Sequence, residues 1–374
     1  MFNKLLKLDW ILILASLLLL TVGLLALYSI SVSGKTENGM NIFDRQVIFA
    51  IIGIIAMFSL SFIDYRYFRS HSKLVYFSML IILTSVLVLG TISRGTVGWL
   101  TVGSFHIQPV ELAKVLLILS LASFITKSKT VLSENLRIIV AVFLSGIAIF
   151  LVLQQPDFGS ALVLMSILAV MILLSGIEWK YLIGIILIGI VVVIVGWFFL
   201  ADYQKDRLIN FVNPENDPQG SGYNVIQSVI AVGSGGLTGK GLGHGSQSQL
   251  NFLPESHTDF IFAVIVEEFG VLGAGIVLSL LTVIFYRMKK IAEIATDNFG
   301  YLIVVGSMAM FFIQVLINIG MNMGIMPVTG IPLIFLSYGG SSLISVFITI
   351  GIVNNIFVIG KKSVETKIKT EDNF

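Results

Sequence analysis

The sequence predicts an all-α polytopic membrane protein with about ten transmembrane helices. Of its 374 residues, 56% are hydrophobic and only 12% are charged, whereas soluble domains carry about 25% charged residues. The mean hydropathy is +0.98. The apolar residues also fall into runs of about 17–25, the length that crosses a hydrocarbon core. Residues 1–374 are therefore expected to form a single integral membrane domain.

Ten apolar runs follow one another along the chain. The expected spans are 10–30, 45–63, 74–90, 109–126, 137–153, 159–176, 180–200, 260–285, 300–323 and 333–360. The first run resembles a signal peptide, but it is too long and has too many successors, so it is expected to be retained. Pro327 and Pro332 interrupt the chain between the last two runs and leave their boundaries open.

Loop charges predict the orientation. Lys and Arg gather in the loops on the side of the N-terminus, and the opposite side carries only Lys35, Arg45, Arg94, Lys205, Arg207 and Lys240. Because positive loops stay in the cytoplasm, both termini are expected to be cytoplasmic and Asp259 to face outside. The net charge of +2 gives no reason to expect a nucleic-acid partner. With no cysteine, disulfides and thiol catalysis are excluded.

The one long connection, 201–258, lies on the outer side between the seventh and eighth helices. Structureless loops longer than about 12–15 residues usually carry a function or are disordered. This loop contains Ile226–Val232, which is apolar enough for a short helix on the membrane surface. The charged tail 361–374 is expected to be disordered.

Asp259 stands where this loop meets the eighth helix. A carboxylate there is stabilised by the helix dipole and by free N–H groups. On a straight helix, Glu267 and Glu268 would lie about 12–13 Å deeper. Ionisable groups inside hydrocarbon usually mark a functional site. The alternative is a capping Asp followed by two structural glutamates that pair with neighbouring helices.

A glycine-rich segment, Gly233–Gly245, contains Lys240 but fails the phosphate-loop pattern, because Ser234 and Gly241 stand at required positions. Two interpretations stay open: a flexible loop, or backbone N–H groups directed at an anion. The start of the fourth helix carries Gln108–Lys114, in which Glu111 and Lys114 are spaced to pair with each other. Alternatively, Lys114 places a cation near a lipid-linked phosphate, as does Arg45.

Two further polar segments lie on the outer side. Gln154–Ser160 contains Asp157 between Pro and Gly, which is ordinary turn chemistry. Met326–Ser342 is irregular in pattern, and irregular backbone at membrane depth must be buried in protein or line a wet cavity. The sequence therefore predicts a cavity near Asp259.

Taken in this order, these blocks resemble the shape, elongation, division and sporulation (SEDS) family of bacterial cell-wall proteins, the family of RodA, FtsW and SpoVE. The similarity rests on Gln108–Lys114, Gln155–Gly159, Leu253–Phe262, Pro327–Pro332 and Phe335–Ser342. Asn213–Pro218 and His244–Pro254 are more like the elongation member of the family. Val110 replaces the usual Ser, and Arg94–Trp99 lacks the usual Arg-Trp pair.

The resemblance implies a peptidoglycan glycosyltransferase of the bacterial cytoplasmic membrane that polymerises lipid II for elongation and cell shape. It also implies a class B penicillin-binding protein as partner, together with other elongation or division proteins and membrane lipid. The position of Asp259 is essential in the family, and those of Glu111, Lys114, Trp99 and Glu267 support it.

The implied transfer inverts the sugar linkage, so it needs one base for the acceptor hydroxyl and stabilisation of the leaving pyrophosphate. Asp259 is the expected base, and His257 is its rival because histidine titrates nearer neutrality. Lys114, Arg45 and Lys240 are candidates to stabilise the leaving charge. A divalent cation, Mg²⁺ or Mn²⁺, held by carboxylates and pyrophosphate is compatible with the sequence, although no ligand spacing requires it.

Two other functions remain open: a lipid II flippase and a non-catalytic scaffold for the transpeptidase. A flippase needs a continuous polar path, whereas the inner halves of the expected helices carry almost no charge. A scaffold leaves Glu267 and Lys114 unexplained. Polymer formation in detergent would distinguish the enzyme from both.

Overall fold

The computed structural model describes residues 6–32, 36–37, 40–93, 96–103, 105–176, 205, 211, 221–250 and 252–371. Most of these residues are helical. The helices are α2 (Trp10–Val32), α3 (Ile42–Phe62), α4 (Arg66–Ser70), α5 (Ser72–Leu89), α6 (Pro109–Ser128), α7 (Glu134–Leu153), α8 (Phe158–Leu173), α11 (Ser221–Ser234), α12 (Ser246–Gln249), α13 (Ile261–Ile294), α14 (Asn298–Asn322) and α15 (Gly340–Glu371).

Eight of the described helices are long and apolar enough to cross a membrane, and α8 is a shorter apolar helix. These nine coincide with nine of the ten expected spans. The remaining span, 180–200, lies outside the described residues, as do Arg94 and 213–218. The last helix begins at Gly340 rather than at 333, because Phe335 has a φ of 64°, outside the right-handed helical region.

Short β-strands connect some of the spans. The all-α prediction did not include these strands. β1 (Thr36–Glu37) pairs with β2 (Met40–Asn41), and β4 (Thr96–Val102) pairs with both β3 (Thr91–Ser93) and β5 (Phe105–Ile107), always antiparallel. Apart from the seven-residue β4, they are too short to give a clear two-residue alternation in the sequence.

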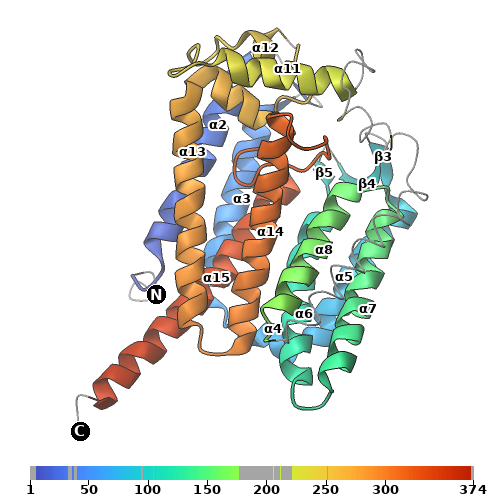
Figure 1. The fold of residues 1–374 in the computed structure, drawn as a ribbon, viewed down its shortest axis with the longest axis vertical. Helices are drawn as coiled ribbons and strands as arrows, with labels where there is room; N and C mark the ends of the chain where they lie inside the picture. The colour runs from blue at the N-terminus through green and yellow to red at the C-terminus, as the bar shows by residue number, and fades with distance from the viewer. Residues whose placement is uncertain are drawn as a thin grey trace.

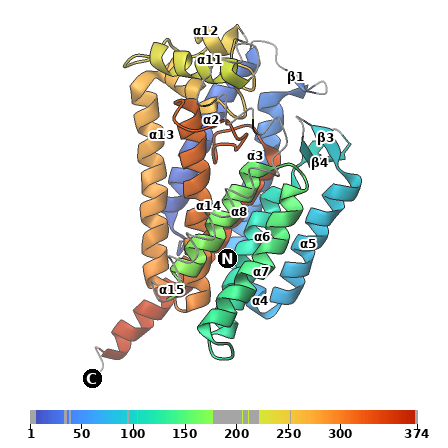
Figure 2. The ribbon, with the colours of Figure 1, turned by 45° about the vertical axis from the view of Figure 1, so that its right-hand side comes forward.

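The long helices form a bundle with two distinct ends (Figure 1). α11 and α12 lie across one end, beside the β3–β5 sheet; we call this the loop end. α2 begins and α15 finishes at the opposite end, the terminal end, and a second view shows the same arrangement (Figure 2). The short helix expected at Ile226–Val232 is present within α11.

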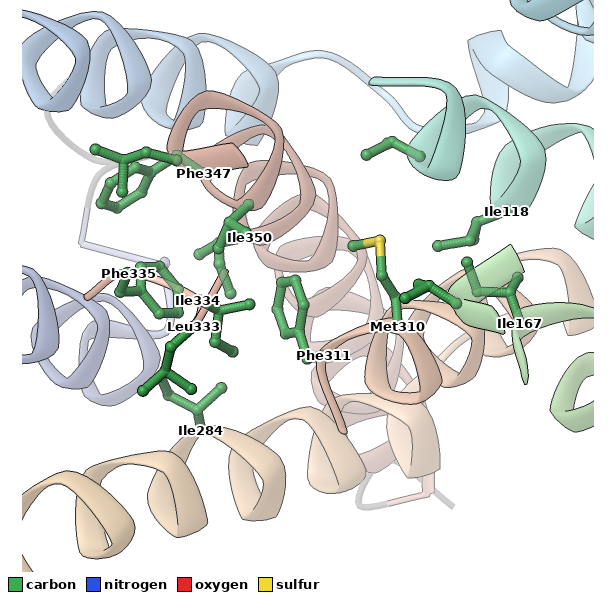
Figure 3. Packing of buried hydrophobic residues seen from close by; sticks show 14 of the residues in the cluster. Ile118, Ile167, Ile284, Met310, Phe311, Leu333, Ile334, Phe335, Phe347 and Ile350 are labelled. Atoms are coloured by element: carbon green, nitrogen blue, oxygen red, sulfur yellow. The ribbon is translucent and has the colours of Figure 1, made fainter. Parts of the chain in front are cut away.

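The irregular segment before α15 is held inside the bundle. Phe335 contacts Phe311 of α14 and Phe347 of α15 edge to face, at centroid distances of 6.3 and 5.5 Å, and Leu333 and Ile334 lie in the same cluster (Figure 3). A Cβ on Gly23 of α2 would lie 2.7 Å from the Leu336 backbone. Close approach at a small residue is how membrane helices associate, so this segment has a fixed position.

α13 is broken at Gly270, whose φ of 68° and ψ of −164° are not helical. The glycine-rich segment supplies the hydrogen bonds lost at the break. The carbonyl of Glu267 accepts from the Lys240 N–H at 3.0 Å, and the Val271 N–H donates to the Gly236 carbonyl at 3.0 Å. The segment is therefore docked on α13, and its N–H groups at Lys240, Gly241 and Gly243 donate to Glu267 and Glu268.

The break changes where the two glutamates lie. Glu268 accepts a hydrogen bond from Ser29, three residues before the end of α2 at the loop end. Asp259, at the start of the same segment, contacts the last turns of α14 at that end. Because 261–269 runs between these two points, the straight-helix depth of about 12–13 Å is wrong for Glu267 and Glu268.

Candidate active site

A cavity of about 110 Å³ at the loop end joins the polar segments that the sequence showed separately. We call it the site cavity. Its lining residues are Trp99, Gln108, Asp157, Thr258, Asp259, Thr329, Gly330, Pro332, Tyr338, Gly339, Gly340, Ser341 and Ser342. The cavity expected beside Asp259 is thus present. It is lined by β4 and by residues at the starts of α6, α8, α13 and α15.

Asp259 is positioned through its backbone. It precedes the first residue of α13, Ile261, by two positions, and its carbonyl accepts hydrogen bonds from Nδ2 of Asn318 at 3.0 Å and of Asn322 at 2.9 Å. Asn322 Oδ1 also accepts from the Ala263 N–H at 3.0 Å. An asparagine of α14 therefore satisfies a free N–H in the first turn of α13.

The segment after Pro332 is tied to the residues around Asp259. The Ser337 hydroxyl donates to the Thr258 carbonyl at 2.6 Å and accepts from the Leu333 N–H at 2.8 Å. The Tyr338 N–H donates to the His257 carbonyl at 2.8 Å. These bonds fix both walls of the site cavity relative to each other.

Gln46 of α3 fixes the same segment from the other side. Its Nε2 donates to the Ser337 carbonyl at 3.0 Å, and its Oε1 accepts from the Gly339 N–H at 3.2 Å. The side chain is fully buried. A buried amide that uses both its donor and its acceptor holds irregular backbone in one conformation.

The remaining wall comes from the starts of α6 and α8. The Gln108 N–H donates to the Ser341 hydroxyl at 2.8 Å. Asp157 is the N-cap of α8, and its Oδ1 accepts from the Ser160 N–H at 2.9 Å. Asp157 therefore has the structural role expected of a turn residue and also borders the site cavity with Asp259.

Glu111 and Lys114 form an ion pair with a distance of 2.7 Å between Nζ and Oε1, and both side chains are buried. Neither residue lines the site cavity, and the same is true of Arg45, which is buried in the first turn of α3. His257 contacts Tyr338 with its ring, at a centroid distance of 5.6 Å, and is not among the lining residues.

Glu267 and Lys240 belong to a different cluster. Their side chains pair at 2.8 Å, with Glu267 fully buried and Lys240 29% exposed. The Glu267 carboxylate also accepts from the N–H groups of Gln247 at 3.0 Å and Ser248 at 3.3 Å. This pair holds α12 and the glycine-rich segment on α13, away from the lining of the site cavity.

Four positioning residues were missed by the sequence analysis: Gln46, Asn318, Asn322 and Ser337. Three of them are amides inside apolar helices, where polar side chains usually bond across helices. The spacing of four between Asn318 and Asn322 places both on one helix face. That signal was present in the sequence.

The described lining of the site cavity contains two carboxylates, Asp157 and Asp259, and no Lys or Arg. Such a site can accept a proton or attract a cation. The described residues contain no group of three or more potential metal ligands. Mg²⁺ is usually bound in proteins by one or two carboxylates together with phosphate oxygens of a ligand.

The family model for cell cycle proteins of the FtsW, RodA and SpoVE type matches residues 9–362. Stage V sporulation protein E of Bacillus subtilis (strain 168) is 40% identical over 354 residues, covering 93% of this chain and 96% of its own. Peptidoglycan glycosyltransferase MrdB of Escherichia coli (strain K12) is 38% identical over 349 residues, with coverages of 91% and 92%. One chain of a peptidoglycan synthase complex, solved to explain how polymerization and crosslinking are coordinated, superposes with a TM-score of 0.78 at 30% identity and coverages of 95% and 98%.

Proposed function

The chain belongs to the FtsW, RodA and SpoVE family of cell cycle proteins, and on that premise we propose that it is a peptidoglycan glycosyltransferase that polymerises lipid II. Its relative MrdB carries that enzyme name. The proposal includes the outer face of the bacterial cytoplasmic membrane as the place of reaction and cell-wall elongation as its use. The two identities, 40% to the sporulation relative and 38% to MrdB, lie too close to separate these roles.

One observation supports the proposal most directly: Asp259 and Asp157 border the same cavity at the loop end. A glycosyl acceptor brings a hydroxyl that must lose a proton, and the donor brings a pyrophosphate that must leave. A carboxylate fixed by two asparagines through its own backbone is suited to the first task, because a base must stay within reach of one hydroxyl.

In the proposed reaction, the Asp259 carboxylate takes the proton from the acceptor hydroxyl as that oxygen attacks the donor sugar carbon. The bond from this carbon to the pyrophosphate oxygen breaks, and the electron pair leaves with the lipid pyrophosphate. One displacement inverts the linkage. Trp99 lines the same cavity and offers an apolar face to a sugar ring.

Stabilisation of the leaving pyrophosphate is proposed to involve a divalent cation, Mg²⁺ or Mn²⁺. Asp157 would hold it together with phosphate oxygens, and when bound it would offset the negative charge of the leaving group. Asp157 retains one carboxylate oxygen for this, because the other caps α8. Full polymerisation in excess chelator would exclude the cation.

A class B penicillin-binding protein is the proposed partner, since the similar chain was solved within a peptidoglycan synthase complex. Lys114, Arg45, Lys240 and Glu267 stay in the proposal as supporting residues. The ion pairs of Lys114 with Glu111 and of Lys240 with Glu267 support a role in fixing helices around the site.

The test is polymerisation of purified lipid II in detergent by the chain with its transpeptidase partner. Asp259→Asn removes the base and keeps the shape, so the rate should fall by about 10²–10⁴-fold with an unchanged unfolding midpoint. Asp297→Asn is the matched control, because Asp297 caps α14 at the terminal end, and it should polymerise normally.

Each outcome selects a function. If wild type makes no polymer in detergent while it binds lipid II, flipping or scaffolding replaces the enzyme. If wild type and Asp259→Asn make polymer equally fast, the enzyme stands and another residue is the base.

A further inference from the structure

A second cavity, of about 730 Å³, lies between α5, α6 and α7 in the half of the bundle toward the terminal end. It is unrelated to the site cavity, with which it shares no lining residue. Its volume falls in the range of about 300–1,000 Å³ found for ligand pockets. Figures 1 and 2 show these three helices side by side at the edge of the bundle.

The wall of this cavity is mainly apolar and opens sideways. Leu74 and Phe77 of α5 line it and are 67% and 59% exposed, on a helix apolar enough to span the membrane. Apolar side chains exposed on such a helix face lipid. The cavity is therefore open to the hydrocarbon of the membrane.

The depth of the cavity matches one leaflet. Along α6 its lining runs from Leu117 to Ser128, which is roughly 16 Å at about 1.5 Å per residue. A whole hydrocarbon core measures about 30 Å. The cavity thus extends from the terminal end to about the bilayer centre, the depth that an acyl chain occupies.

The mouth of the cavity is cationic. Lys73, at the start of α5, is exposed and forms no ion pair within the described part of the chain. Lys127 borders the mouth as well and is held in place, since its Nζ donates to the Arg69 carbonyl and, at 3.0 Å, to the Ser72 hydroxyl. The described lining contains no Asp or Glu.

Two hydroxyls lie deeper. Ser120 Oγ and Ser145 Oγ are buried and have no hydrogen-bond partner in the described structure, and both residues line the cavity. Serines elsewhere on these helices, such as Ser128, bond back to their own helix. Buried hydroxyls normally find a partner, and these two serines, which show none in the described structure, both belong to the wall of this cavity.

We propose that the cavity between α5, α6 and α7 is a binding site for one anionic phospholipid of the leaflet at the terminal end. Its phosphate lies at Lys73 and Lys127, and an acyl chain fills the apolar space between the helices. Opposite charge at the mouth and lipid-facing walls select this occupant over a soluble anion, which would not fill an apolar space. The bound lipid would join α5 and α7, which enclose the cavity together with α6.

The test is native mass spectrometry of the full chain in detergent, with phosphatidylglycerol or phosphatidylcholine added. Wild type should retain one phosphatidylglycerol and bind phosphatidylcholine more weakly. Lys73→Gln should weaken phosphatidylglycerol binding about fivefold, the contribution of one lysine beside an anionic membrane surface. Lys289→Gln is the matched control, because Lys289 is an exposed lysine near the terminal end of α13, outside the cavity lining.

A second variant tests the interior without changing charge. Ser145→Leu fills the deep part of the cavity and should reduce phosphatidylglycerol retention to the level of a nonspecific lipid. Its unfolding midpoint checks that it folds, and Lys73→Gln stands as an independent test if it does not. Equal retention by wild type, Lys73→Gln and Lys289→Gln would overturn the proposal. A density map of the chain in phosphatidylglycerol nanodiscs would also overturn it if the cavity held protein side chains or no density in place of a lipid.

Discussion

At the scale of single residues, the position of Asp259 depends on side chains far from it in sequence. Its carbonyl is held by Asn318 and Asn322, and the neighbouring Thr258 carbonyl is held by Ser337. Its side chain lines the site cavity. A residue whose backbone is held in this way keeps its position in the cavity wall, which is what the proposed base requires.

Replacing Asn322 should therefore affect both stability and activity. Asn322→Leu leaves the Asp259 carbonyl with one donor fewer and the Ala263 N–H without its acceptor. We expect a loss of about 1–3 kcal/mol in the free energy of unfolding and slower polymerisation by the folded fraction. Thermal unfolding and lipid II polymerisation measure the two effects.

Asn355→Leu is the matched control. Asn355 is also a buried asparagine that accepts from a backbone N–H, that of Tyr65, and donates to the Ser61 carbonyl, but at the terminal end. It should lose similar stability and keep its activity per folded molecule. Equal loss of activity in both variants would mean that Asn322 has no special link to the site.

The buried pair of Glu111 and Lys114 allows its structural and catalytic roles to be separated. Lys114→Met leaves a buried carboxylate unpaired and should cost about 3–5 kcal/mol. Glu111→Gln combined with Lys114→Met removes both charges and should recover most of that stability. If the pair only holds α6 in place, the double variant also recovers polymerisation. A stable but inactive double variant would show that the charges of this pair have a direct role.

At the scale of elements, the break in α13 and the glycine-rich segment form one unit. A Cβ on Gly239 would lie 2.1 Å from the Glu268 carbonyl oxygen, and one on Gly235 would lie 2.0 Å from that of Val266. Only glycine permits this approach of backbone to backbone. The same contact turns the first segment of α13, which carries Asp259 at its start, across the loop end.

Two alanine substitutions in this segment should differ. Gly236 and Gly239 both have positive φ, 56° and 79°, but a Cβ on Gly236 meets nothing within 4 Å. Gly236→Ala should cost only the left-handed conformation, about 1 kcal/mol. Gly239→Ala should cost at least about 3 kcal/mol, since the backbone bonds to Glu267 and Glu268 are also disturbed. Thermal unfolding measures both, and equal midpoints would contradict the docking of this segment.

At the scale of the whole molecule, the two ends of the bundle carry different features. The loop end carries the site cavity, and the terminal end carries both chain ends (Figure 1). At the terminal end Arg287 of α13 binds Asp9 beside α2 through two nitrogens, at 2.9 and 2.6 Å, and the Asp9 N–H donates to Asn354 of α15 at 2.8 Å. Each end is thus fixed by its own polar contacts, and apolar packing joins them.

The orientation in the membrane can be tested because the chain has no cysteine. Leu237 at the loop end is 74% exposed, and Val131, between α6 and α7, is 78% exposed. With the loop end outside, Leu237→Cys should react with a membrane-impermeant maleimide in intact spheroplasts, and Val131→Cys only after lysis. The reverse pattern would place the site cavity in the cytoplasm.

The sequence by itself determined the helices and the family. Apolar runs long enough to cross a bilayer leave few alternatives to a helix, so nine spans agree with the described helices. Asp259 at the start of α13 and a cavity beside Met326–Ser342 also followed from local pattern.

Only the tertiary structure decided which polar residues share the site. Asp157 and Asp259 are about a hundred positions apart and meet because α8 and α13 present their starts at the same end. Glu267 lies near the loop end and not at the expected membrane depth. Gly270 breaks the helix there, and a distant glycine-rich segment replaces the lost backbone hydrogen bonds. A sequence pattern records the spacing along one helix; contacts between helices depend on close packing and on backbone breaks, which no local pattern contains.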